Sequence, residues 1–118
     1  MPRYVDGFVI CVPKKNMAAY TKMAKLGRKI WMEHGALDYV EAVGDDLKVK
    51  FGLPFTKMAK AKAGETVVFS YITYKSRKHR DAVNKKVMAD KRMDCSGQKA
   101  PFDMKRFAYG GFKAFVEA

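Results

Sequence analysis

The sequence predicts a single domain of the α+β class, in which two helices cover one face of an antiparallel sheet. The chain has 118 residues, which suits one domain. Apolar stretches of strand character are interrupted by two stretches with the three- and four-residue spacing of a helix. The resulting order is strand, helix, strand, strand, helix, strand. This is the ferredoxin-like βαββαβ order.

The first predicted strand and helix occupy the N-terminal third of the chain. Residues 4–12 form a strand with apolar side chains on both faces. Asn16 is a candidate N-cap for a helix over residues 17–34, and Gly35 is the expected stop. Within this helix, Gly27 lies on the apolar stripe. A glycine there lets the helix approach the sheet closely.

The second predicted strand, residues 37–43, leads to two adjacent carboxylates, Asp45 and Asp46. Carboxylates at a strand end can bind a metal or orient a base, and they are also common turn residues. The turn is the favoured interpretation because no third or fourth ligand follows at a suitable spacing. Residues 47–64 are irregular, with a possible short helix over residues 57–63.

A buried strand, a break at Lys75–Ser76 and a basic helix follow, within residues 66–93. Ser76 is the expected N-cap. Arg80 and Asn84 lie on the mainly apolar side of this helix, together with Met88. Buried polar groups need partners, so Arg80 and Asn84 either tie down a neighbouring loop or an Asp, or line a ligand pocket.

The last predicted strand covers residues 107–116 and again carries apolar residues on both faces. Gly110 and Gly111 within it indicate a bulge or a close backbone approach. Three of the four strands are therefore apolar on both sides, whereas the helices cover only one. A second copy of the chain would cover the other face, which predicts a homodimer with a barrel-like core.

Composition limits the classes of partner. The formal net charge is +12, and residues 47–64 contain five basic residues and no acidic one. Binding of nucleic acid or another polyanion is therefore an alternative function, although most aromatic residues fall on predicted core positions. No apolar run approaches 18 residues, so no membrane span is expected. Two cysteines, Cys11 and Cys95, and the lack of a signal-peptide pattern favour the cytoplasm.

The sequence contains no motif that fixes a reaction, and it predicts no metal site and no cofactor. A small-molecule site for an anionic or aromatic ligand, a polyanion-binding surface and a structural dimer without chemistry remain the three hypotheses. An arginine could hold an anionic group bidentately while an aspartate accepts a proton. In the alternative interpretation the same charged groups form a network that fixes the loops. The candidate ligand-binding residues are Asp45, Asp46, Arg80, Asn84, Asp103, Arg106 and Tyr109.

Several motifs, in order along nearly the whole chain, resemble the YbaA-like family of bacterial proteins of unknown function. The resemblance implies the dimeric α/β-barrel superfamily, in agreement with the predicted fold, and carries no assigned reaction. The motifs are Tyr4-Val5-Asp6-Gly7-Phe8, Gly44-Asp45-Asp46, Glu65-x-Val67-Val68-Phe69-Ser70, Arg80-Asp81-x-x-Asn84-x-Lys86-Val87-Met88-x-Asp90, Pro101-Phe102-Asp103-x-Lys105-Arg106 and Gly110-Gly111-Phe112.

Overall fold

The computed structural model describes residues 2–94 and 99–118, so Cys95 lies outside the described residues. These residues form one antiparallel sheet with the strand order β2-β3-β1-β4, the order of a ferredoxin-like fold. The strands are β1 (Tyr4–Pro13), β2 (Asp38–Val43), β3 (Glu65–Tyr74) and β4 (Ala108–Lys113).

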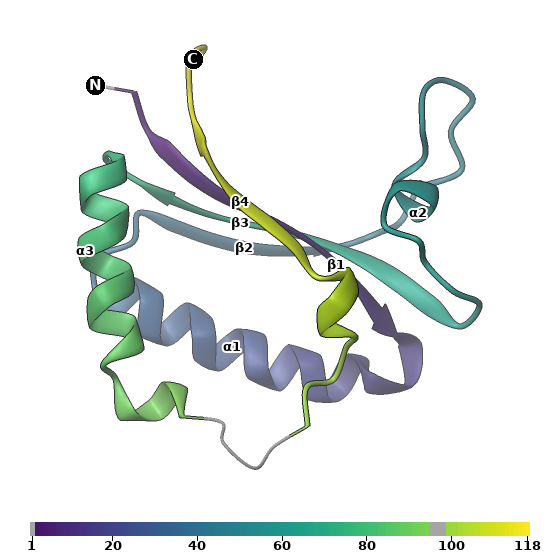
Figure 1. Ribbon diagram of the computed structural model, residues 1–118, viewed down its shortest axis with the longest axis horizontal. Helices are drawn as coiled ribbons and strands as arrows, with labels where there is room; N and C mark the ends of the chain where they lie inside the picture. Colours follow the sequence, from purple (N-terminus) through teal and green to yellow (C-terminus); the bar gives the residue numbers. More distant parts are fainter. Residues whose placement is uncertain (1, 95–98) are drawn as a thin grey trace.

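The two long helices lie on the same face of the sheet (Figure 1). The helices are α1 (Met17–Glu33), α2 (Phe55–Met58) and α3 (Arg77–Met88), with 3-10 turns at Lys14–Asn16, Lys91–Met93 and Met104–Arg106. Ser76 caps α3 as predicted, since its hydroxyl accepts a hydrogen bond from the His79 backbone N–H at 3.1 Å. Gly35 ends α1 with a φ of +114°, a conformation that favours glycine.

The hydrophobic core lies between the sheet and the two long helices, and consists of two clusters. One cluster contains Ile30, Ala36, Ile72, Tyr74, Val83 and Val87. The other contains Ile10, Val12, Tyr20 and Val68. The half-buried ring of Phe8 packs against both clusters and joins them. The strands contribute alternate residues to this core, as the two-residue period predicts.

The other face of the sheet, which we call the open face, is also apolar. The strand register places Val9, Phe69 and Ala42 in one row across it, and Gly7, Tyr71 and Val40 in the next. Phe69 is 47% exposed and Phe112 is 63% exposed on this face. The prediction that the helices leave one apolar face uncovered is therefore confirmed for the described chain.

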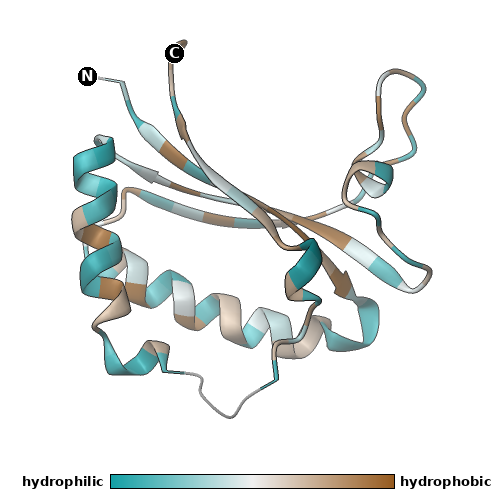
Figure 2. Ribbon diagram, viewed as in Figure 1, coloured by the Kyte–Doolittle hydropathy of each residue, from teal (hydrophilic) through white to brown (hydrophobic). Residues whose placement is uncertain are grey.

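Residues 47–64, which we call the arm, extend from one end of the sheet. Figure 1 shows the arm and both termini rising on the side opposite α1, so they border the open face at its two ends. The arm exposes large apolar side chains: Phe51 is 91% exposed and Leu53 is 67% exposed. The C-terminal tail does the same, with Phe115 at 95% exposure. The arm and the tail thus carry exposed apolar residues beside the open face, and Figure 2 shows brown (hydrophobic) and teal (hydrophilic) stretches alternating along the arm.

The structure corrects several details of the predicted elements. The last strand ends at Lys113, so Phe115 does not belong to the sheet. The short helix of the arm is a single turn that begins at Phe55, directly after the N-cap residue Pro54, whose carbonyl accepts hydrogen bonds from the backbone N–H groups of Lys57 and Met58. Asn16 precedes α1, but its side-chain oxygen accepts no capping hydrogen bond, and its side-chain N–H donates to the Pro101 carbonyl at 3.0 Å.

Two further expectations are corrected on α3 and β4. Met88 is 66% exposed and does not join the core face of α3. The register of β4 against β1 runs without a bulge through Gly110 and Gly111. Gly111 instead makes room for a side chain: a Cβ there would lie 2.7 Å from the ring atom Cε2 of Tyr4.

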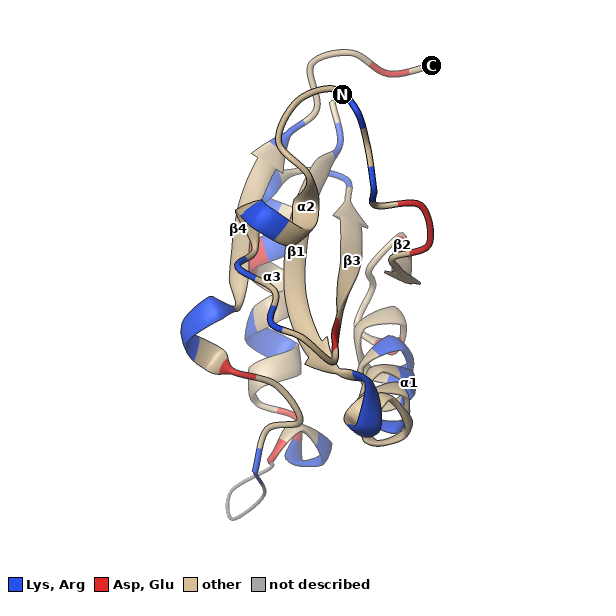
Figure 3. Cartoon of the chain, turned by 90° about the vertical axis from the view of Figure 1, so that its right-hand side faces the viewer, with Lys and Arg blue, Asp and Glu red and all other residues tan. Residues whose placement is uncertain are grey.

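Lysine and arginine lie mainly on the helices, turns and arm, while the strands carry few charges (Figure 3). Within the described ranges, no helix combines the length and the apolar character that crossing a membrane requires.

Candidate functional site

The structure places Arg80 and Asn84 in a partly buried polar network beside the core. Arg80 Nη1 donates to Asp6 Oδ1 at 3.1 Å, and the guanidinium lies over the Tyr4 ring at 4.9 Å. The Asp6 side chain is 7% exposed and that of Arg80 is 19% exposed. Burial raises the pKa of the Asp6 carboxyl, although the Arg80 charge opposes this effect. Arg80 thus neutralises a buried carboxylate of β1.

Asn84 has its own partners within the same network. Its Oδ1 accepts hydrogen bonds from Trp31 Nε1 at 3.1 Å and from the Tyr74 hydroxyl at 3.3 Å. These contacts join α1, β3 and α3 around one side chain. Burial raises the pKa of Tyr74, so its hydroxyl stays protonated and remains a donor.

A second cluster surrounds Arg106 at the far end of β1 and β3. Its guanidinium forms a bidentate pair with Glu65, at 2.6 Å and 2.7 Å. It also donates to Asp103 Oδ2 and to the Lys60 carbonyl, both at 3.0 Å. The arm and the segment before β4 are therefore fastened to the start of β3. Nearby, the buried Cys11 thiol donates to the Ala59 carbonyl at 3.3 Å.

We expect the Glu65–Arg106 pair to make the fold sensitive to acid. The hydrogen bonds from Arg106 lower the pKa of Glu65 from 4.5 to about 2. A carboxyl with a lowered pKa in the folded state stabilises the fold above its ordinary pKa of 4.5, and this contribution disappears as the pH falls toward about 2. Chemical denaturation across this range measures the loss. In a Glu65→Gln variant the stability is expected to fall less steeply with acid; an unchanged slope would contradict the assignment.

The remaining predicted residues do not join either cluster. Asp45 and Asp46 are exposed in the turn after β2 and make no hydrogen bond or ion pair with the described residues. Tyr109 is exposed on β4, where its ring stacks on Phe8 with centroids 6.0 Å apart. The predicted site residues thus lie in separate groups.

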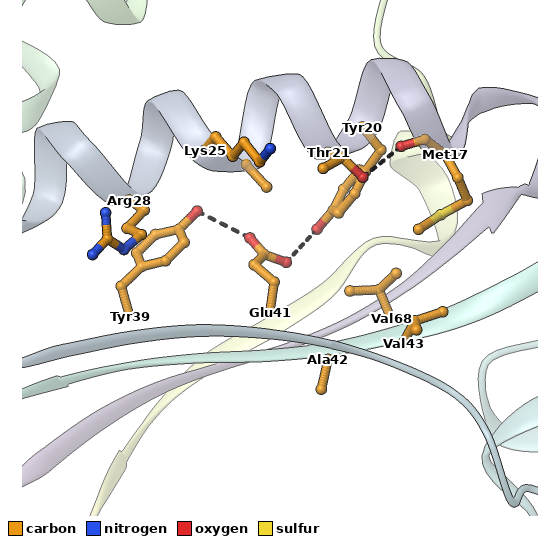
Figure 4. Close-up of a pocket in the computed structure, with 11 residues that line it drawn as sticks. Met17, Tyr20, Thr21, Lys25, Arg28, Tyr39, Glu41, Ala42, Val43 and Val68 are labelled. Atoms are coloured by element: carbon orange, nitrogen blue, oxygen red, sulfur yellow. Dashed lines mark hydrogen bonds between the residues drawn. The ribbon is translucent and has the colours of Figure 1, made fainter.

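A groove of about 350 Å³ lies between α1 and the edge strand β2. Its centre is the Glu41 carboxylate, which accepts a hydrogen bond from each of two tyrosines (Figure 4). The Tyr20 hydroxyl lies 2.7 Å from Oε1, and the Tyr39 hydroxyl lies 2.9 Å from Oε2. The groove is lined by Met17, Tyr20, Thr21, Ala24, Lys25, Arg28, Tyr39, Glu41, Ala42, Val43 and Val68.

The electrostatics of this groove follow from burial and charge. Burial and the neighbouring Glu41 carboxylate raise the pKa values of Tyr20 and Tyr39 well above the usual value for a phenol, so both hydroxyls stay protonated. Lys25 and Arg28 line the groove from α1 (Figure 4), and neither forms an ion pair with another described residue. The groove therefore combines a hydrogen-bonded carboxylate with two cations that form no ion pair within residues 2–94 and 99–118.

Tyr20, Tyr39 and Glu41 lie outside the set predicted from the sequence. The sequence of β2 contains one feature that could have pointed to them. Glu41 shares the helix-facing side of this strand with Tyr39 and Val43, and a carboxylate on a core-facing strand position requires hydrogen-bond donors. The partner from α1, Tyr20, is visible only once the helix is packed on the sheet. The arrangement ties the edge strand to α1 and also offers hydrogen-bond acceptors to a ligand.

Gly27 makes the Tyr39–Glu41 contact possible, so we expect Gly27→Ala to destabilise the protein. A Cβ at this position would lie 2.7 Å from the Tyr39 hydroxyl oxygen. The variant should lose about 1–3 kcal/mol of unfolding free energy, the usual effect of overpacking, even though alanine has the higher helix propensity. Thermal or urea denaturation measures this change. In a Tyr39→Phe background, which lacks the hydroxyl, the loss should shrink; an equal loss there would contradict the explanation.

Comparison with known proteins identifies the family. The family model described as "Protein of unknown function (DUF1428)" matches residues 3–104 of the chain. The chain belongs to the DUF1428 family. The uncharacterized protein YbaA of Escherichia coli K12 is 43% identical over 115 residues, covering 98% of both chains. The uncharacterized protein YbaA of Shigella flexneri gives the same values. The resemblance to the YbaA-like family is therefore confirmed.

A solved structure supports the fold of this DUF1428 member. A dimeric ferredoxin-like protein from an uncultured marine organism superposes with a TM-score of 0.65 and covers 100% of both chains. Its sequence is only 10% identical, so the likeness concerns the fold alone. The ferredoxin-like α+β prediction is confirmed by this match.

Proposed function

We propose that the protein is a homodimer, joined through the open face of the sheet, and that each subunit binds a small anionic or aromatic molecule in the groove between α1 and β2. The groove carries this proposal. It is concave, largely apolar and fitted with a few convergent polar groups, the usual properties of a small-molecule site. The Lys25 and Arg28 side chains, which form no ion pair with the residues that the structure describes, supply the attraction for an anion.

The groove is not lined by any of the ligand-binding candidates that were chosen from the sequence. Arg80 and Arg106 already have carboxylate partners within the protein. An incoming anion would have to displace those partners, at the expense of leaving buried carboxylates unpaired. Lys25 and Arg28 require no such exchange, which favours the groove over either ion cluster.

The exposed apolar surface supports the homodimer. Phe69 and Phe112 on the open face, Phe51 on the arm and Phe115 on the tail are all largely exposed in a single chain. Apolar surfaces of this extent normally pack against a partner. A second copy offers an identical apolar face, and closed two-fold symmetry is the commonest arrangement of homo-oligomers. The solved relative in fold is itself described as dimeric.

A titration followed by two-dimensional NMR tests the ligand site. Isotope-labelled protein is titrated separately with benzoate, phosphate and phenol, and backbone shifts are followed. Benzoate is expected to shift groove residues such as Ala24 and Val43, and a Lys25→Gln/Arg28→Gln double variant should lose this response. Lys29→Gln is the matched control, because Lys29 is exposed on the same helix but does not line the groove.

The other hypotheses give different results in the same experiment. If none of the three ligands moves groove resonances, the protein is better described as a structural dimer. Binding of nucleic acid receives less support, because the strand register puts the exposed aromatic residues Phe69 and Phe112 on the open face. This face lies opposite α1, whose basic residues are blue in Figure 3. A binding constant for RNA or DNA that falls steeply with salt would favour it instead.

A further inference from the structure

We propose that the ligand of the groove is a small acid that also carries a hydroxyl group, with the hydroxyl donating to Glu41 and the acidic group lying against Lys25 and Arg28. This inference rests on the proposed function of the groove and adds the class of ligand. It follows from three properties of the groove: its hydrogen-bonding capacity, its charge and its size.

The base of the groove offers hydrogen-bond acceptors. An ionised carboxylate has about four lone-pair positions, and the two tyrosines use one on each oxygen of Glu41. Among the described residues, no other donor reaches this carboxylate. Each Glu41 oxygen therefore retains capacity to accept a further hydrogen bond, and Glu41 itself is only half-buried.

The two tyrosine hydroxyls are not available as hydrogen-bond donors to the ligand. Each phenol has one O–H, and in both cases this O–H is already directed at Glu41. The Thr21 hydroxyl is also committed, since it donates to the Met17 carbonyl at 2.7 Å. A ligand that displaces water from Glu41 must bring its own donor, because an unpaired buried acceptor is unfavourable. The groove thus selects molecules with a hydroxyl or amino group at this point.

The charge of the groove favours a hydroxyl over an amino group. The groove is lined by one carboxylate, Glu41, and by two exposed cations, Lys25 and Arg28. These three groups leave a net positive charge that an anionic ligand would neutralise. A hydroxy acid carries one negative charge and neutralises the excess, whereas an amino acid is a zwitterion and leaves the excess in place. The acidic group of the ligand therefore belongs on the α1 side and its hydroxyl on the β2 side (Figure 4).

The walls and the volume limit the size of the ligand. Met17, Ala24, Val43 and Val68 provide apolar contacts. The volume of about 350 Å³ lies near the small end of the range for ligand pockets, roughly 300–1,000 Å³. A molecule with a single aromatic ring or a short branched chain fits this space. Hydroxybenzoates combine the ring, the acid and the hydroxyl, and are suitable probes.

The test compares analogues on the native protein. Ortho-, meta- and para-hydroxybenzoate are titrated by calorimetry or NMR, beside benzoate, which lacks the hydroxyl, and para-hydroxybenzyl alcohol, which lacks the acid. At least one hydroxybenzoate is expected to bind about tenfold more tightly than benzoate, the effect of one charge-assisted hydrogen bond. The alcohol should bind more weakly than the same hydroxybenzoate.

Single substitutions test which side chains cause the tighter binding of the hydroxybenzoate. Glu41→Gln should abolish the preference for the hydroxybenzoate over benzoate, whereas Lys25→Gln should weaken both acids alike and Lys29→Gln should change neither. If benzoate binds as tightly as every hydroxybenzoate, the hydroxy-acid inference is wrong while the anion site stands. If neither benzoate nor any hydroxybenzoate binds, both proposals fail. The analogue comparison needs no variant, so it holds even if Glu41→Gln does not fold.

Discussion

The Arg80→Ala variant is expected to lose about 3 kcal/mol of unfolding free energy, because it leaves the Asp6 carboxylate buried without its cation. Breaking a buried pair from one side usually destabilises by about 3–5 kcal/mol, and Arg80 retains 19% side-chain exposure, which places the effect at the lower end. The Arg80 contact with the Tyr4 ring is lost as well. Urea denaturation at neutral pH measures the change.

The pH dependence distinguishes this explanation from a simple loss of packing. Burial raises the pKa of Asp6 in the folded protein, and removal of Arg80 raises it further. The loss of stability in the variant should therefore be small at acid pH, where Asp6 is protonated in both the folded and the unfolded state, and grow as the pH rises.

Adding Asp6→Asn to Arg80→Ala should recover part of the loss at neutral pH. Lys78→Ala, an exposed change on the same helix, should alter stability by no more than about 0.5 kcal/mol. A loss that is independent of pH would contradict the role assigned to Arg80.

The Phe69→Lys variant is expected to convert the proposed homodimer to monomers. Phe69 lies on the central strand β3 and is 47% exposed on the open face. In a two-fold symmetric dimer the substitution places two like charges at a desolvated interface, which should raise the dissociation constant by a factor of about 100 or more. Sedimentation velocity over a range of protein concentrations measures this shift.

The matched control is Met88→Lys, on the outer side of α3. Met88 is 66% exposed and does not belong to the open face, so the variant adds the same charge without touching the proposed interface. It should sediment as the native protein does. Circular dichroism should show both variants folded. A Phe69→Lys protein that remains folded and dimeric would exclude the open face as the contact surface.

Most of the fold could be predicted from the sequence because it depends on local periodicity. The runs of apolar, β-branched and aromatic residues in β1 and β3, and the helical spacing of α1 and α3, each lie within one segment. The boundaries that were wrong depend on tertiary contacts. Asn16 was expected to cap α1, but the Pro101 carbonyl attracts its side chain, and Pro101 is remote in the sequence. The end of β4 at Lys113 depends on its pairing with Tyr4, the first residue of β1.

The candidate site also depends on tertiary contacts that the sequence does not reveal. Arg80 and Asn84 were recognisable as buried polar groups from the helix pattern, but not their partners, Asp6 in β1 and Trp31 in α1. The two alternatives for these residues therefore could not be separated. The groove was not predicted at all, since it arises from packing α1 against β2 and from the space that Gly27 leaves for a tyrosine hydroxyl.

The most direct test of the proposed function is a crystal structure of the protein soaked with a mixture of small carboxylates, phosphates and phenols. We expect two copies packed through their open faces and ligand density in the groove between Glu41 and Lys25. The chemical identity of that density would name the class of ligand. If the groove holds only water, and the soaked compounds bind elsewhere or not at all, the proposal is contradicted. The proposed dimer would then have no assigned ligand site.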